Sequence, residues 1–155
     1  MARSKRARRP AKRRPAAAPP KSPSPSPAET ALLTLARTLT AVTTSEPSPR
    51  AAVATALDVL ASVFEAGAPL PRALAQARSA ALRDETRALA LAWAREQLRL
   101  SLGEILARAA GDLHVTLPAE SLAWLVLAAC EALADEPREA APDRLRLLAE
   151  WLTGD

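Results

Sequence analysis

The side chains that most often carry nucleophilic or metal-assisted catalysis are scarce in this chain. Its 155 residues include one His, one Cys and no Tyr. His114 falls in a predicted connector and Cys130 in an apolar predicted helix, so their positions do not indicate a catalytic dyad. Zinc takes three or four protein ligands, and a buried Cys usually serves as a small apolar residue. We therefore predict no metal site and no enzyme activity.

Phosphate loops and acid–base pairs are not indicated either. The chain has four glycines, too widely spaced for a phosphate-binding loop: Gly67, Gly103, Gly111 and Gly154. The adjacent carboxylates Asp84/Glu85 and Asp135/Glu136 fall near predicted helix ends, where capping and solvation account for them. We predict no cofactor, so the function must depend on how the structural elements pack and what they bind.

Charge divides the chain into two unlike parts. Residues 1–27 hold nine Lys/Arg, seven Pro and no acid, which gives +9. Residues 28–155 hold 12 Arg against 17 Asp/Glu, which gives −5 and a total of +4. Most of the basic side chains of the first part lie in its first half: Arg3, Lys5, Arg6, Arg8, Arg9, Lys12, Arg13 and Arg14.

The basic segment, residues 1–27, is predicted to be a disordered tail. It has almost no large apolar residue to bury, and its prolines remove backbone donors and block helix propagation. Its charges would attract nucleic acid non-specifically, through counterion release. Three other interpretations stay open: compositional bias of an Ala-, Arg- and Pro-rich chain, an organelle transit peptide, and a solubilising tail.

Residues 28–155 are predicted to form one all-α helical bundle. A quarter of this segment is Ala, Leu and Arg are abundant, and β-branched residues are scattered. Ser48 is a suitable N-cap with Pro49 as the first helical residue, and Gly67 is a suitable C-terminal cap. Apolar periodicity and these caps predict helices over 28–43, 49–66, 71–82, 84–110, 118–135 and 142–153.

The predicted helix over 118–135 is unusually apolar. From Leu122 to Ala134 it carries one charged residue, Glu131, and large apolar side chains on every side. Such a helix is expected to be buried all round, yet it is too short to span a bilayer, which needs about 20 apolar residues. A domain of this size has few helices with which to surround it. We therefore expect a partner chain to cover part of it, with the helix over 142–153 as the second half of the interface.

The order of these helices resembles the C-terminal ligand-binding and dimerisation domain of tetracycline-repressor (TetR)-type transcriptional regulators. The resemblance covers roughly residues 50–154 and rests on three segments: REQLRLSLGEILARAAGDL, PAESLAWLVLAACEAL and DRLRLLAEWLTG. It implies a homodimer, or a heterodimer with a related regulator, through the last two helices. By position, the interface residues would be Trp124, Leu125, Ala128, Leu145, Leu148 and Trp151.

The resemblance also implies a pocket for a small, hydrophobic ligand. The candidates for its walls are Phe64, Leu89, Trp93 and Gln97, with simple core packing as the competing interpretation. The helix-turn-helix domain with which such regulators begin has no counterpart here, because only the basic tail and one Thr-rich helix stand in its place. Operator-specific DNA binding is therefore not predicted.

Three functions remain as hypotheses. The first is a cytoplasmic, regulator-like module that dimerises and binds a small ligand. The second is a nucleoid-associated protein whose tail binds nucleic acid while the bundle oligomerises. The third is a folded part of a longer gene product. None of them involves a membrane.

Overall fold

A computed structural model describes residues 24–65, 67–133 and 141–154, and within them it contains six helices and no strand. The helices are α1 (Pro27–Ser45), α2 (Pro49–Phe64), α3 (Pro69–Ala81), α4 (Glu85–Arg108), α5 (Ala119–Leu133) and α6 (Ala141–Thr153). The predicted all-α class is confirmed. Most of the predicted tail, residues 1–23, lies outside the described residues.

Serine caps define the beginnings of the first two helices. The Ser26 hydroxyl accepts a hydrogen bond from the Glu29 backbone N–H at 3.2 Å and donates one to the Glu29 carboxylate at 2.8 Å. In the same way Ser48 accepts from the Ala51 N–H at 3.2 Å, and Pro49 opens α2 as predicted. Each cap satisfies a backbone donor that has no partner within the helix. Because Pro27 follows its cap directly, α1 begins one residue before the predicted domain boundary.

Several other helix ends differ from their predicted positions by one or two residues, and α1 ends at Ser45 rather than at residue 43. Helix α3 begins at Pro69 rather than at residue 71, because proline fits the first turn, where no intrahelical N–H is required. Helix α4 ends at Arg108, two residues earlier than predicted, and Gly111 lies beyond it in the connector. Gly67 has a φ of 96°, the left-handed conformation expected of the glycine that follows α2.

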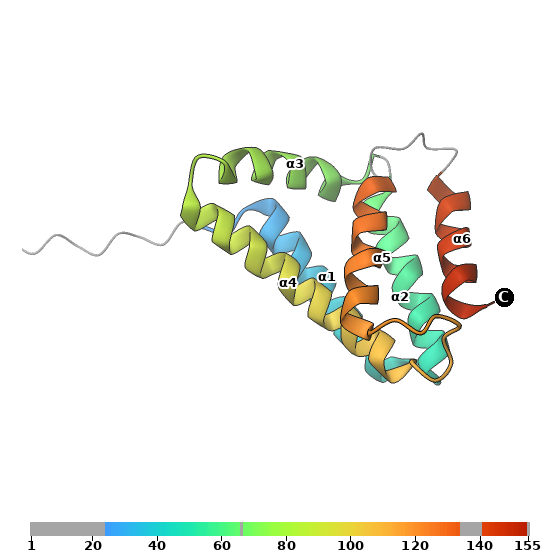
Figure 1. Cartoon of the computed structure of the whole chain (residues 1–155). Coiled ribbons are helices and arrows are strands. Elements are labelled where there is room, and N and C mark those ends of the chain that lie inside the picture. Colours follow the sequence, from blue (N-terminus) through green and yellow to red (C-terminus); the bar gives the residue numbers. More distant parts are fainter. Residues whose placement is uncertain (1–23, 66, 134–140, 155) are drawn as a thin grey trace, which may run out of the picture.

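Helices α1 and α4 run side by side in the same direction and form the long axis of the bundle (Figure 1). The Arg108 guanidinium donates to the Thr43 carbonyl at 2.8 Å, and the hydroxyls of Thr40 and Ser101 lie 3.4 Å apart. Helix α3 crosses above this pair, while α2, α5 and α6 stand together at the other end (Figure 1). This arrangement leaves α5 between α4 on one side and α6 on the other.

One apolar core joins the helices. Its largest fully buried side chains come from every helix except α3: Leu32, Leu39, Val53, Leu60, Phe64, Leu98, Leu102, Ile105, Leu106, Leu122, Val126 and Leu152. The connector between α4 and α5 holds the end of α6, because the His114 N–H donates to the Leu152 carbonyl at 3.0 Å. Helix α6 is thereby attached to the bundle at its C-terminal end.

No single helix among the described residues is long and apolar enough to cross a membrane. Helices α2 and α3 meet that test only when taken together, and they are bent by 67° at the break between them.

Candidate functional site

The candidate site is built around helix α5, which has a buried side, an open side and a hollow on each flank. Its core side is fully or nearly fully buried and consists of Leu122, Ala123, Val126, Cys130 and Leu133. Its opposite side is open, which agrees with the prediction that this domain has too few helices to surround it, and the partner chain expected to cover the open side remains a prediction. Helices α2, α4 and α6 pack around only part of its circumference.

We call the open side, with the neighbouring part of α6, the outer face. Its residues are Trp124, Leu125, Ala128 and Ala132 of α5 and Leu147 and Trp151 of α6. Trp124 is 62% exposed, Leu147 58% and Trp151 47%. An aromatic side chain can bury about 150–250 Å², so each of these indoles leaves on the order of 100 Å² in contact with water. The outer face therefore exposes large apolar side chains on two adjoining helices.

A groove of about 440 Å³ separates α5 from α6 within this surface. Its walls are apolar apart from Arg144: Ala129, Ala132, Leu133, Leu147, Leu148 and Trp151. The α5 wall is made largely of alanine and the α6 wall of larger side chains. We call this feature the α5/α6 groove.

A second hollow, of about 320 Å³, lies on the other flank of α5, and we call it the α4/α5 cleft. Its apolar lining comes from three helices and consists of Leu32, Ala92, Leu98, Trp124, Leu127 and Ala128. Its polar lining is two arginines and two glutamates, Arg95, Arg99, Glu96 and Glu131. The cleft thus combines a hydrophobic floor with a charged edge.

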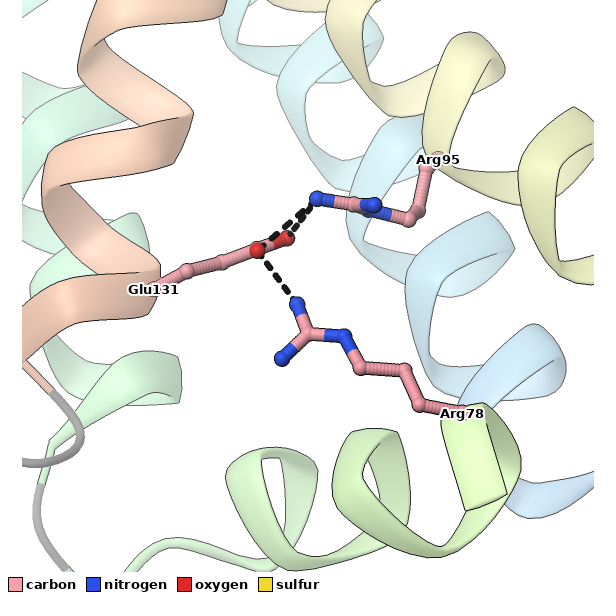
Figure 2. Close-up of polar contacts among 3 residues, drawn as sticks. All are labelled: Arg78, Arg95 and Glu131. Atoms are coloured by element: carbon pink, nitrogen blue, oxygen red, sulfur yellow. Dashed lines mark hydrogen bonds and ion pairs between the residues drawn. The ribbon is translucent and has the colours of Figure 1, made fainter. Parts of the chain in front are cut away.

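Glu131 is the centre of an ion cluster at one end of this cleft. The Arg95 Nη2 atom lies 2.7 and 2.8 Å from the two Glu131 carboxylate oxygens, and Arg78 donates to the same carboxylate. Figure 2 shows the two guanidinium groups approaching this carboxylate from α4 and α3. The Glu131 side chain is only 18% exposed, so the arginines supply the partners that a mostly buried carboxylate requires. Glu131 thereby links α5 to both α3 and α4 through ion pairs.

A separate ion pair lies along the α4 side of the cleft. Arg99 binds Glu96 through two parallel hydrogen bonds, of 2.8 Å from Nε and 2.6 Å from Nη2. The hydrogen bond from Arg99 lowers the pKa of Glu96 below its usual value, and the same bond raises the pKa of Arg99. Both groups are charged at neutral pH. Arg99 also donates to the Glu120 carbonyl at 3.4 Å, which links α4 to the first turn of α5.

The four pocket candidates from the sequence do not come together as the walls of one pocket. Phe64 is buried in the core, and Gln97 is half-buried on α4. Leu89 and Trp93 are 65% and 56% exposed on the outside of α4. Successive residues of an α-helix are about 100° apart, so Trp93 lies far around the helix from buried Leu91. The exposure of Leu89 and Trp93 fits neither a pocket wall nor core packing, the two interpretations that the sequence left open for them.

Most of the predicted interface residues, unlike the pocket candidates, do lie on one surface. Trp124, Leu125 and Ala128 all lie on the outer face, and so does Trp151. Leu148 is half-buried and packs against the core while it lines the α5/α6 groove. The side chain of Leu145 lies outside what the structure describes. Whether these residues meet a partner chain remains a prediction.

The Arg78–Glu131–Arg95 cluster was not predicted. The available signal was Glu131 itself, the one charged residue between Leu122 and Ala134. A carboxylate within an apolar helix requires a cationic partner, but the sequence does not identify which of 21 Lys/Arg residues that is. The pairing depends on how α3, α4 and α5 cross.

The described part of the chain contains no metal-binding cluster, and its one cysteine is buried. No cluster of three or more His, Cys, Asp or Glu residues there could hold a metal ion. Cys130 is fully buried and not in a disulfide. No protein-family model, curated protein or solved structure matches this chain.

Proposed function

We propose that this protein is a non-enzymatic, regulator-like module that forms a homodimer through α5 and α6 and binds a small ligand beside that interface. The observation that carries the proposal is the outer face, with two exposed tryptophans and a leucine over adjoining helices. Exposed apolar surface of this kind is typical of protein interfaces, and aromatic residues are enriched there. A role in transcriptional regulation rests on the sequence resemblance alone.

The outer face is suited to a second copy of the same chain. A two-fold axis places one surface against itself, so the surface must be self-complementary. If the axis passes beside Ala128, an antiparallel pair of α5 helices brings Trp124 opposite the partner's Ala132. A large side chain then meets a small one at both ends, as ridge-into-groove packing requires. The alanine wall of the α5/α6 groove gives the incoming tryptophan room.

The test is the oligomeric state of a charge variant. Leu147→Glu is chosen because this leucine is 58% exposed, so its replacement should not disturb the core. Light scattering should find the wild-type chain as a dimer and Leu147→Glu as a monomer, because an interface cannot bury an unpaired carboxylate cheaply. Leu89→Glu is the matched control, since Leu89 is equally exposed but lies on α4. A wild-type monomer, or a Leu147→Glu dimer as stable as the control, would contradict the proposal.

A second function, non-specific nucleic-acid binding by the tail, is favoured by the nine basic residues and no acid in residues 1–27. Since Ser26 caps α1, a tail deletion should stop at residue 23, which removes all nine charges and keeps the cap. The full chain should shift DNA regardless of sequence, steeply less at higher salt, and the deletion variant should not. A full chain that fails to shift DNA at low salt would rule this function out.

A further inference from the structure

We propose that the α4/α5 cleft binds an amphipathic anion, a medium-length alkyl chain that ends in a carboxylate. This inference specifies the ligand class for the ligand-binding function proposed above, and it is tested independently of dimerisation. The alkyl chain would lie on the apolar floor of the cleft, and the carboxylate would face Arg95.

Apolar side chains form the floor and one wall of the cleft. Leu32 and Leu98, from α1 and α4, are almost completely buried and form its floor, while Trp124 and Leu127 form the α5 wall. The volume of about 320 Å³ lies at the lower end of the range of small-molecule sites, which is roughly 300–1,000 Å³. The size favours a short, unbranched apolar body over a large ring system.

The Glu131 end of the cleft is positively charged. Two guanidinium groups, Arg78 and Arg95, share the single carboxylate of Glu131, which among the described residues leaves a local excess of one positive charge. Glu96 does not cancel this excess, because both of its oxygens are bound by Arg99. Glu120 faces a neighbouring surface hollow with Trp124 and Leu125 and does not line the cleft. A bound anion would neutralise the excess.

Arg95 has hydrogen-bond donors that Glu131 does not use. Its Nη2 atom alone makes both bonds to Glu131, and its Nε and Nη1 atoms have no hydrogen-bond partner among the described residues. A guanidinium has five N–H donors in a planar fork that matches the two oxygens of a carboxylate. Arg95 can therefore keep Glu131 on one side and accept a second carboxylate on another. An alcohol or an amine of the same length would gain no such contact.

The experiment is isothermal titration of the full chain with octanoate, and with 1-octanol and octylamine as ligands of matched length. Octanoate should bind saturably, at least about tenfold more tightly than either analogue, because only the carboxylate offers Arg95 two negatively charged acceptor oxygens. This comparison needs no variant. Absence of saturable octanoate binding, or equal affinity for octanoate and octanol, would overturn the proposal.

Three variants locate the site. Arg95→Met should weaken octanoate binding about tenfold while leaving octanol unaffected. Glu131→Gln should strengthen octanoate binding, because it removes the competing carboxylate and keeps the side-chain shape. Arg87→Met is the control, since Arg87 pairs with Asp84 at 3.4 Å outside the cleft. Unchanged octanoate affinity in both Arg95→Met and Glu131→Gln would place the ligand elsewhere.

Dimerisation and ligand binding fail separately in these tests. Trp124 and Ala128 belong to both surfaces, but the residues chosen for the tests do not: Leu147 does not line the cleft, and Arg95 does not lie on the outer face. A protein that dimerises but does not bind octanoate would overturn only the proposed anion site. A monomer that binds octanoate selectively would overturn only the proposed dimer.

Discussion

Cys130 illustrates how burial determines what a single side chain of this protein can do. It lies on the core side of α5, and desolvation raises the pKa of its thiol from 9.0 to about 12, with a smaller contribution from the charge of Glu131. The folded protein therefore keeps the thiol proton at pH values where an unfolded chain loses it. Below about pH 9 the thiol is neutral in both states, so the burial of the neutral thiol contributes its full stabilisation there. This stabilisation is lost progressively as pH rises from about 9 to about 12.

We predict that Cys130 is unreactive in the native state. At pH 8 its thiolate fraction is reduced about a thousandfold by the raised pKa, since each pKa unit is a factor of ten. A thiol-specific reagent should therefore modify the denatured chain rapidly and the native chain at least a hundredfold more slowly. Native labelling within a factor of ten of the denatured rate would show that the thiol is open to solvent.

Residue-scale chemistry was partly predictable from the sequence. The scarcity of nucleophiles and the burial of Cys130 in an apolar helix could be inferred directly. Glu131 was visible as an isolated charge, but its partners Arg78 and Arg95 lie 53 and 36 residues away in the chain. Local patterns carry no information about pairings of that range.

At the scale of elements, the sequence is most informative where side chains bond to their own backbone. The Ser48 cap and the position of Gly67 were recognised because both are local features. The end of α4 was predicted two residues late, because Ala109 and Ala110 favour helix and only the tertiary structure decides where it stops. Leu89 and Trp93 are exposed on α4 rather than in a pocket or the core, because only the tertiary packing decides which side of this helix is covered.

Two glycines give opposite predictions for the same substitution. Gly103 lies inside α4, where an added Cβ would be 3.8 Å from the Ala123 Cβ, an ordinary contact. Gly103→Ala should raise the free energy of unfolding by about 0.5–1 kcal/mol, through reduced backbone entropy of the unfolded chain. Gly154 has a φ of +73° and a Cβ there would meet the His114 side chain at 3.0 Å, so Gly154→Ala should lower it by about 1 kcal/mol.

Urea denaturation of both variants beside the wild type measures this contrast. If Gly103→Ala destabilised the protein by more than 1 kcal/mol, the packing of α4 on α5 would be closer than described. If Gly154→Ala were neutral, the end of α6 would not be held against the connector at His114.

At the scale of the whole molecule, the helix pattern predicted an all-α bundle but not its surfaces. The apolar character of residues 122–134 correctly drew attention to α5. Only the packing shows that α5 stands between a groove toward α6 and a cleft toward α4, and that Trp124 lines the cleft. A hollow depends on how three or more helices cross, and one-dimensional periodicity does not contain those crossing angles.

The most direct test of the account is the solution mass of a tryptophan–alanine exchange on α5, measured by light scattering. The wild-type chain should have twice its 16.4 kDa monomer mass. Ala132→Trp should be monomeric, since two tryptophans then occupy one space, and the double variant Trp124→Ala, Ala132→Trp should restore the dimer. Ala75→Trp, on the exposed side of α3, serves as the control and should remain dimeric. A wild-type monomer, or Ala132→Trp that dimerises as well as Ala75→Trp, would contradict the proposed interface.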